Sequence, residues 1–288
     1  RFKNNFSFEN NLKSLILKTN ITFLVLPTPS KKDGSFSNSY ILKCLDELAK
    51  LLKLKRKRNH KIIITSTTSP GSCEKFVIYL EKKGLKNNID FSMVYNPHFI
   101  AQGTTIVNLE KPDLILVGTD NSKTRSEINN FYNKLYRNKV KIKNTNFREG
   151  EISKIAINCY ITTKISFANY IAELSENSKN SDAKIILDVI GQDNRIGHSY
   201  LKVGSKFSGP CFPRDNHALI NYSKNQRIDP LIATATNLTN SRQSNRILKI
   251  IKKLLKVNKN KLSLGICGLT YKSDTNLILD SQGDSLIK

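Results

Sequence analysis

The chain has 288 residues, of which 39% are hydrophobic and 24% are charged. A chain of this length and composition can bury a core and form two domains, which excludes an intrinsically disordered protein. Its net charge of +24 suits an anionic partner such as a nucleic acid, although the Lys residues are spread along the whole chain. No apolar run approaches the roughly 18 residues of a membrane span, and the polar start lacks the apolar segment of a secretory signal. Because the first residue is Arg1 rather than Met, we expect the chain to be part of a longer protein.

The cysteines and histidines point to a reduced protein without a metal. Five cysteines, an odd number, are widely spaced along the chain, which excludes a disulfide framework and favours the cytoplasm. The four histidines do not have zinc-ligand spacing. We interpret Cys44, Cys159 and Cys267 as structural because they fall on apolar faces or strands.

The first half of the chain alternates short apolar runs with helical patterns. We expect strands at 21–26, 61–65, 91–95 and 114–117, and helices at 37–54 and around 76–80. Such alternation predicts a parallel sheet with helices on both faces.

The second half reads mostly as helix. One pattern runs from 151 to 176 without Pro or Gly, and further helices are expected at 182–190 and within 214–256. A strand at 261–266 and a helix starting near Ser281 follow.

Cys211 has the setting of a nucleophile. The segment 206–215, KFSGPCFPRD, brings this cysteine through small residues to the start of a helix, with Pro213 in its first turn. Unpaired N–H groups at a helix start, and the adjacent Arg214, stabilise a thiolate. A buried structural cysteine remains the alternative.

Lys154 and Asn158 are four residues apart and share one face of the 151–176 helix. On a largely apolar helix this pair could stabilise a developing oxyanion. An exposed lysine whose stem packs on the surface, next to an ordinary asparagine, explains the spacing equally well.

Six segments resemble the UDP-glucose/GDP-mannose dehydrogenase family. They are LPTP at 26–29, STTSPG at 66–71, NPHFIAQG at 96–103, DNRIG at 193–197 with Lys202 after it, GPCFPRD at 209–215 and GLTYKSDT at 268–275. Six matches in the family's order cover nearly the whole chain and are hard to obtain by chance. The resemblance implies an α/β fold: a truncated Rossmann-type parallel sheet over 1–145, a central all-α dimerisation region with a long helix over 146–256, and the start of a truncated UDP-binding domain over 257–288.

The resemblance also implies an activity, the NAD-dependent four-electron oxidation of the C6 alcohol of a nucleotide sugar to a carboxylate. UDP-glucose is the expected substrate, with a UDP-N-acetylhexosamine or GDP-mannose as alternatives. The resemblance further implies that Cys211 forms the covalent thiohemiacetal and thioester, that Lys154 and Asn158 hold the oxyanion, and that Asp215 with Lys154 and Thr67 positions water. His98 stands where the family has a hydrolytic Glu. The expected partners are a UDP-sugar and a second copy of the chain, with no membrane.

Binding residues follow from the same matches. The cofactor side comprises Leu26, Pro27, Thr28, Pro29, Ser66, Thr67, Thr68, Gln102 and Arg214. The substrate side comprises Phe99, Ile100, Ala101, Gln102, Lys154, Asn158, Arg195 from a neighbouring subunit, Lys202, Phe207, Ser208, Gly209, Tyr271 and Lys272.

Several residues depart from the family pattern. Besides His98, Lys206 and Ser208 stand where glycine is common, and Leu279 stands where the family has Arg. Ser208 is expected to restrict the backbone. No Gly-x-Gly-x-x-Gly occurs, although a dinucleotide pyrophosphate needs such a turn. We therefore expect this chain alone to bind NAD weakly.

Two other functions stay open. The departures fit a catalytically impaired member that serves as a dimerisation scaffold. The basic stretch 53–58 and the Lys-rich helix 246–256 fit a nucleic-acid-binding module, whose signature is a steep salt dependence.

Overall fold

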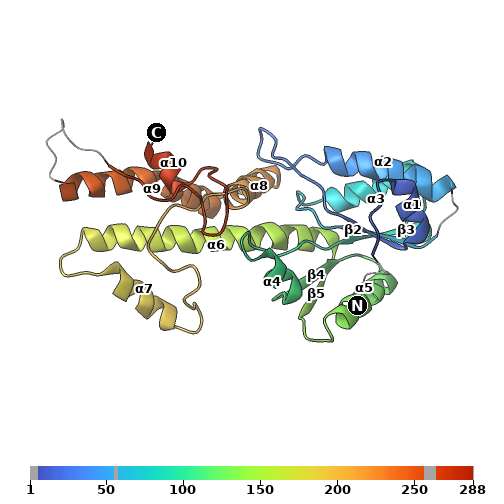
Figure 1. Ribbon diagram of the computed structural model, residues 1–288, viewed down its shortest axis with the longest axis horizontal. Coiled ribbons are helices and arrows are strands. Elements are labelled where there is room, and N and C mark those ends of the chain that lie inside the picture. The colour runs from blue at the N-terminus through green and yellow to red at the C-terminus, as the bar shows by residue number, and fades with distance from the viewer. Residues whose placement is uncertain (1–5, 55–57, 256–263, 288) are drawn as a thin grey trace. The chain divides into compact units, whose positions relative to one another are not determined.

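The computed structural model describes residues 6–54, 58–255 and 264–287 (Figure 1). The chain divides into two compact units, Arg1–Lys32 with Phe36–Lys154, and Asp33–Ser35 with Ile155–Lys288. We refer to them as unit 1 and unit 2.

Unit 1 contains a five-stranded sheet of order β1-β2-β3-β4-β5. Its strands are β1 (Ile21–Leu24), β2 (His60–Ile64), β3 (Phe91–Tyr95), β4 (Ile115–Gly118) and β5 (Ile142–Thr145). Ile21 pairs with Lys61 and His60 pairs with Phe91, both in parallel register. Every residue of β2 and β3 is buried, as expected for central parallel strands covered on both faces.

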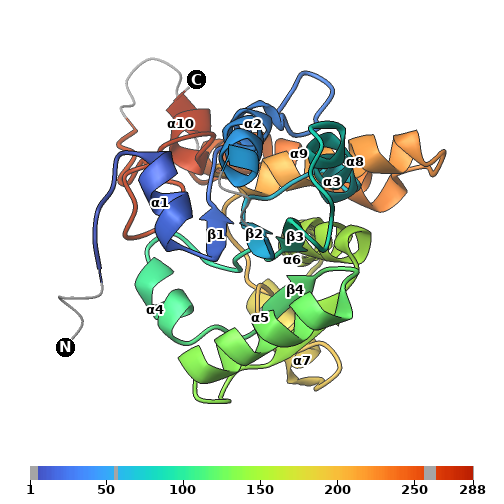
Figure 2. The same ribbon diagram turned by 90° about the vertical axis from the view of Figure 1, so that its right-hand side faces the viewer.

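Helices cover both faces of this sheet (Figures 1 and 2). They are α1 (Leu12–Lys18), α2 (Ser39–Leu54), α3 (Ser72–Lys82), α4 (Thr105–Glu110), α5 (Ser122–Leu135) and the first turns of α6 (Phe147–Glu176). Alternation along β2 separates two cores: Ile62 and Ile64 pack with α1, α2 and α3, whereas Ile63 packs with α5. The expected helices and the four expected strands are confirmed in this unit.

The orientation of β4 differs from the expected all-parallel sheet. β3 pairs with β4 in antiparallel fashion, through Tyr95 and Gly118. The connection runs from residue 96 to residue 114, and only the six residues of α4 within it are helical. Tyr95 and Gly118 are the last residues of their strands, so β3 and β4 approach each other from opposite directions and pair at their carboxyl ends.

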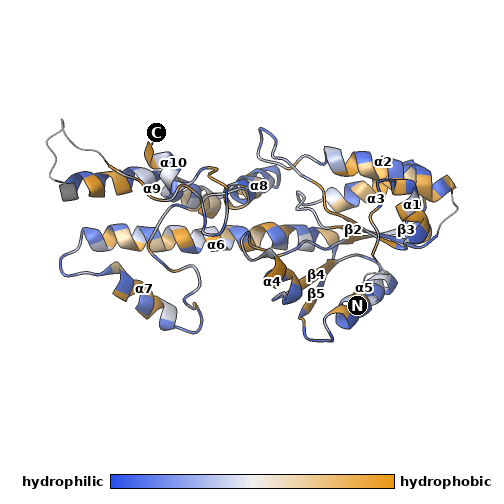
Figure 3. Cartoon of the chain, viewed as in Figure 1, coloured by the Kyte–Doolittle hydropathy of each residue, from blue (hydrophilic) through white to orange (hydrophobic). Residues whose placement is uncertain are grey.

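Unit 2 is helical over its described residues. It contains the remainder of α6, then α7 (Ala183–Gln192), α8 (Phe212–Asn225), α9 (Leu231–Leu255) and α10 (Gln282–Ile287). Hydroxyl contact between Thr163 and Thr236 at 3.1 Å and an ion pair between Glu173 and Arg242 at 3.1 Å hold α6 and α9 side by side. Figure 3 shows apolar and polar residues interleaved along both helices.

The expected strand at 261–266 is not found. Residues 264–266 form no strand, and 261–263 lie outside the described residues. A strand needs a partner for its backbone groups, and none pairs with this segment in the described part of unit 2. Cys267 is consequently exposed, contrary to its structural interpretation, whereas Cys159 is buried and Cys44 half-buried.

None of the described helices combines the length and the apolar character needed to cross a bilayer. Across the same residues, no group of three or more His, Cys, Asp or Glu side chains is arranged to hold a metal ion.

Candidate active site

Cys211 lies exposed at the start of α8. It is the N-cap residue, and a proline occupies the first turn. Pro213 fits there because it lacks the N–H that would be unpaired anyway. The carbonyl of Cys211 accepts a hydrogen bond from the Asp215 N–H at 2.9 Å. The thiol therefore sits where a helix start favours its ionised form.

Asp215 links Cys211 to α6. Its side chain is 1% exposed, and Oδ2 accepts a hydrogen bond from Asn158 Nδ2 at 2.6 Å. Arg214 Nε lies 3.4 Å from the other carboxylate oxygen. Burial, and then the charge of Asp215, raises the pKa of Cys159 to about 12. Cys159 is thus a protonated thiol, and the exposed Cys211 is the reactive candidate of the two.

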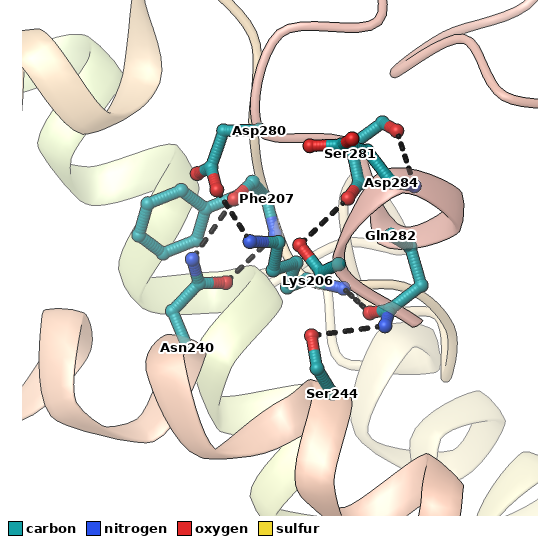
Figure 4. Close-up of polar contacts among 9 residues, drawn as sticks. Lys206, Phe207, Asn240, Ser244, Asp280, Ser281, Gln282 and Asp284 are labelled. Carbon is teal, nitrogen blue, oxygen red and sulfur yellow. Dashed lines mark hydrogen bonds and ion pairs between the residues drawn. The ribbon is translucent and has the colours of Figure 1, made fainter. Parts of the chain in front are cut away.

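The loop that leads to Cys211 is held by side-chain amides (Figure 4). Asn240 of α9 accepts from the Phe207 N–H at 2.7 Å and donates to the Phe207 carbonyl at 2.8 Å. Asn169 likewise accepts from Gly204 N and donates to the Ser205 carbonyl. Each amide thus replaces the backbone partners that an irregular buried loop lacks. Phe207 and Ser208 are both buried.

Gly209 is the one position in this loop that requires glycine. Its φ is +82°, and a Cβ there would lie 2.5 Å from the ring of Tyr271. Neither Lys206 nor Ser208 has a positive φ. The expected restriction of the backbone at Ser208 is therefore wrong, because Gly209 is the residue of this loop that adopts the left-handed conformation. The carbonyl of Leu279 accepts from Gly209 N at 3.3 Å, which ties this loop to the C-terminal segment.

In unit 1, Lys154 is buried against the segment after β3. Its Nζ donates to the His98 carbonyl at 2.8 Å and lies 4.8 Å from the centre of the Phe99 ring. Lys154 is only 9% exposed, so the interpretation as a solvent-exposed lysine does not hold. Burial, and then the nearby charge of Lys154, lowers the pKa of His98. The imidazole is therefore neutral at neutral pH and can accept a proton.

The loops that follow β1 and β2 are joined by hydrogen bonds. Ser66 Oγ accepts from Leu26 N at 2.8 Å and donates to the Leu26 carbonyl at 2.6 Å. Thr28 Oγ1 donates to the Thr67 carbonyl at 2.7 Å. Thr28 and Thr68 are buried, and Thr67 is half-buried. The carboxyl ends of these parallel strands thus form one continuous edge, the usual place for a ligand in such a sheet.

Glu151 anchors this edge and was missed by the sequence reasoning. It is 0% exposed, and its carboxylate accepts from Gly71 N, Cys73 N and Thr68 Oγ1 at 2.5, 2.9 and 3.0 Å. Burial raises the pKa of Glu151, and the N–H groups of Cys73 and Gly71 oppose that shift. The carboxylate thus fills the start of α3, where a phosphate could otherwise bind. Its only sequence signal is an acid on an apolar helix face, three residues before Lys154.

The remaining expected residues lie at the surface. Arg195 and Lys202 are exposed, and Arg195 Nη2 lies 2.5 Å from Asp193 Oδ2. Ile100, Ala101, Gln102 and Lys272 are also exposed, as are Pro27 and Pro29. Tyr271 is half-buried, and burial and then the neighbouring Cys211 raise its pKa. The structure therefore gathers Cys211, Asn158, Arg214 and Asp215 within unit 2, and Lys154, His98 and Phe99 within unit 1.

Two family comparisons match this arrangement. Residues 1–137 match the NAD binding domain of the UDP-glucose/GDP-mannose dehydrogenase family, and residues 148–242 match its central domain. The chain belongs to the UDP-glucose/GDP-mannose dehydrogenase family. The cofactor of this family is NAD.

Curated relatives carry the same family activity in their names. The chain is 31% identical to the UDP-glucose 6-dehydrogenase of Rickettsia typhi (strain ATCC VR-144 / Wilmington), over 97% of this chain and 62% of that protein. It is 29% identical to UDP-glucose 6-dehydrogenase TuaD of Bacillus subtilis (strain 168), over 94% of this chain and 56% of that protein. The chain thus spans about 60% of the length of these relatives.

Solved structures agree on the fold. A UDP-glucose dehydrogenase from Pyrobaculum islandicum superimposes with a TM-score of 0.86 at 26% identity, covering 97% of this chain and 63% of that one. A UDP-D-ManNAc dehydrogenase from Pyrococcus horikoshii gives 0.80 at 22% identity, covering 96% and 64%. The Rossmann-like α/β fold class is confirmed.

The observed edge of the sheet fits one side of an NAD molecule. The exposed prolines of loop 26–29 and the half-buried Thr67 can line a dinucleotide at the ends of β1 and β2. The start of α3 cannot take the pyrophosphate, because the Glu151 carboxylate already occupies Gly71 N and Cys73 N.

The basic segments are partly neutralised within the chain. Arg246 pairs with Glu176 and has a side chain only 10% exposed, while Arg242 pairs with Glu173. Of the basic stretch 53–58, residues 55–57 lie outside the described part. Arg242 and Arg246 of α9 thus bind carboxylates of α6, whereas Lys249, Lys252 and Lys253 of the same helix are exposed.

Proposed function

We propose that the chain forms the catalytic part of an NAD-dependent dehydrogenase that oxidises the C6 alcohol of a nucleotide sugar to a carboxylate. UDP-glucose is the first candidate substrate, because the curated relatives named above are UDP-glucose 6-dehydrogenases. The observation that carries the proposal is the exposed Cys211 at the start of α8, beside a buried Asp215 bound to Asn158.

Bound NAD supplies the hydride acceptor, one molecule for each two-electron step. After the alcohol has lost a hydride and a proton, Cys211 Sγ adds to the aldehyde carbon and a thiohemiacetal forms. Loss of a second hydride and a proton leaves a thioester. Water then breaks the C–S bond, which releases the carboxylate and restores the thiol.

The oxygen on the reacting carbon needs donors at each stage. We assign this task to Lys154 and Asn158, which lie one turn apart on α6. Asn158 is oriented by its bond to Asp215, and Lys154 by its bond to the His98 carbonyl. Both donors are therefore held in place before the substrate arrives, which lowers the cost of reorganisation.

Hydrolysis of the thioester needs a base for the attacking water. Asp215 is one candidate, together with Thr67. His98 is the other: its pKa is lowered by burial and then by Lys154, so its neutral ring can take up a proton.

The test compares two exposed cysteines of the full-length protein. Cys211→Ala removes the nucleophile, and Cys267→Ala is the matched control. Purified variants are mixed with UDP-glucose and NAD, and NADH and acid product are measured. We expect acid formation to fall by about 10³-fold or more for Cys211→Ala and to stay unchanged for the control. Normal acid production by Cys211→Ala would refute the proposal.

We also propose that the chain pairs with a second copy through α6. Large apolar side chains stay exposed at helical spacing along this helix: Ile157, Tyr160, Phe167, Tyr170 and Leu174. A surface of this kind marks an interaction site. Phe167→Asp should produce monomers in light scattering, whereas Ile185→Asp, at an exposed apolar residue of α7, should not. A monomeric parent protein would contradict this proposal.

A further inference from the structure

Lys206 points into the protein rather than into solvent. Its side chain is 10% exposed, and Nζ lies 2.6 Å from Asp280 Oδ1 (Figure 4). A lysine in a loop usually extends its ammonium group into water. Here the ammonium group instead meets a carboxylate that lies 74 residues later in the chain.

A glutamine makes a second contact between the same two segments. Gln282 Oε1 accepts a hydrogen bond from the Lys206 N–H at 3.2 Å. Gln282 Nε2 donates to Ser244 Oγ of α9 at 3.0 Å. Gln282 therefore joins the loop to α9. Ser281, which is 0% exposed, precedes α10, and its Oγ accepts a hydrogen bond from the Asp284 N–H at 3.1 Å.

The same C-terminal segment reaches the loop again near Cys211. The Gly209 N–H donates to the Leu279 carbonyl at 3.3 Å, and the Tyr271 ring packs so closely on Gly209 that no Cβ fits between them. Contacts from residues 271–282 thus hold both Lys206 and Gly209, and Gly209 precedes Cys211 by two residues.

We propose that Lys206 is a positioning residue whose ion pair with Asp280 latches the C-terminal segment onto the loop that carries Cys211. We call these two residues the latch. Its effect on turnover rests on the function proposed above, but its effect on the loop does not. Lys206 is a departure from the family pattern, and the latch gives this departure a role.

Removing one charge of the latch and removing both charges have different consequences for stability. Removing the carboxylate leaves the charge of a lysine side chain that is only 10% exposed without its partner, which costs more than removing both charges together. The loop must then move until Lys206 reaches water. Because the Tyr271 ring lies against Gly209, the same movement draws this ring away, and Cys211, which is already exposed, becomes more accessible.

The experiment measures the loop directly in the full-length protein. Hydrogen exchange is followed at the amides of Lys206 and Gly209, and alkylation of Cys211 by iodoacetamide is followed by mass spectrometry in a Cys267→Ser background. In Asp280→Asn, we expect amide exchange to be about tenfold faster and alkylation about threefold faster. Lys206→Glu combined with Asp280→Lys should restore both rates.

Arg242→Ala is the matched control, because it removes another ion pair of unit 2 at a largely exposed arginine. It should leave both rates unchanged. Circular dichroism establishes folding, and if Asp280→Asn does not fold, the conservative Asp280→Glu must keep parental rates while Lys206→Met accelerates them. Unchanged rates in the variants that open the latch, or no rescue by the exchanged pair, overturn the latch. A full-length protein that makes no acid but shows these changes refutes the proposed function and leaves the latch standing.

Discussion

The two units hold their functional loops by opposite means. In unit 1, one fully buried carboxylate, Glu151, collects the backbone N–H groups of Gly71 and Cys73. In unit 2, neutral amides hold the backbone of the Cys211 loop, with Asn240 paired to both polar groups of Phe207. The difference teaches that a charge suits a helix start, where several donors converge, whereas an amide suits an extended loop, which offers one donor and one acceptor.

Glu151→Ala is the strongest way to break this comparison. The substitution leaves the N–H groups at the start of α3 and the Thr68 hydroxyl buried without their hydrogen-bond acceptor. We expect a loss of about 3 kcal/mol in the free energy of unfolding. Urea unfolding measures it, with the exposed Glu81→Ala on α3 as control. A loss no larger than that of the control would mean that Glu151 is not the anchor of unit 1.

Asn240→Ala tests the other half of the comparison. It leaves the N–H and the carbonyl of Phe207 unpaired, and we expect a loss of about 2 kcal/mol. Asn240→Asp keeps the acceptor but not the donor and should lie between parent and alanine. The control is Asn225→Ala, an exposed amide of α8. Equal stability of the aspartate variant and the parent would show that the Phe207 carbonyl needs no partner.

The pH dependence of stability tests the role of charge in unit 1, where His98 lies beside the charged Lys154. The pKa of His98 is lowered by burial and then by Lys154. Below about pH 6.5, the unfolded chain therefore binds more protons than the folded one, and stability falls as the pH falls through that window. NMR titration measures this pKa, and Lys154→Met should raise it. A pKa above the ordinary histidine value would contradict the assigned environment.

An exposed ion pair gives the smallest effect. Lys50 lies 2.9 Å from Asp46 on the surface of α2, with a side chain 73% exposed. Lys50→Ala should change the free energy of unfolding by about 0.5 kcal/mol or less. Thermal unfolding checks this, and a loss comparable to that of Asn240→Ala would mean that burial is not what separates these contacts.

The sequence predicts the parts of the fold that follow from local patterns. The apolar period of α2, at Ile41, Leu45, Leu48 and Leu52, appears in the structure as one buried face. The orientation of β4 could not be predicted this way, because an apolar run has the same pattern in a parallel and in an antiparallel strand, and the pairing rests on the contact between Tyr95 and Gly118.

The same division applies to the candidate site. Cys211 at the start of α8 could be predicted, because a proline and small residues mark the helix start. The roles of Glu151 and Asn240 could not, because their partners are backbone groups of distant residues, which leave no side-chain pattern. In the sequence, Lys206 is only a departure from the family pattern. Its ion pair with Asp280 is visible only in the structure.

The carboxylate at the start of α3 has one more consequence. Since the chain itself supplies the negative charge that this helix start attracts, Glu151 holds Thr68 and Gly71 from within the protein, and we expect the loop 66–71 to be ordered before a nucleotide binds. An incoming ligand then meets a surface that is already ordered and loses little entropy in arranging it. We therefore expect selectivity at this edge to come from a surface that is fixed during folding rather than from a loop that closes around the ligand.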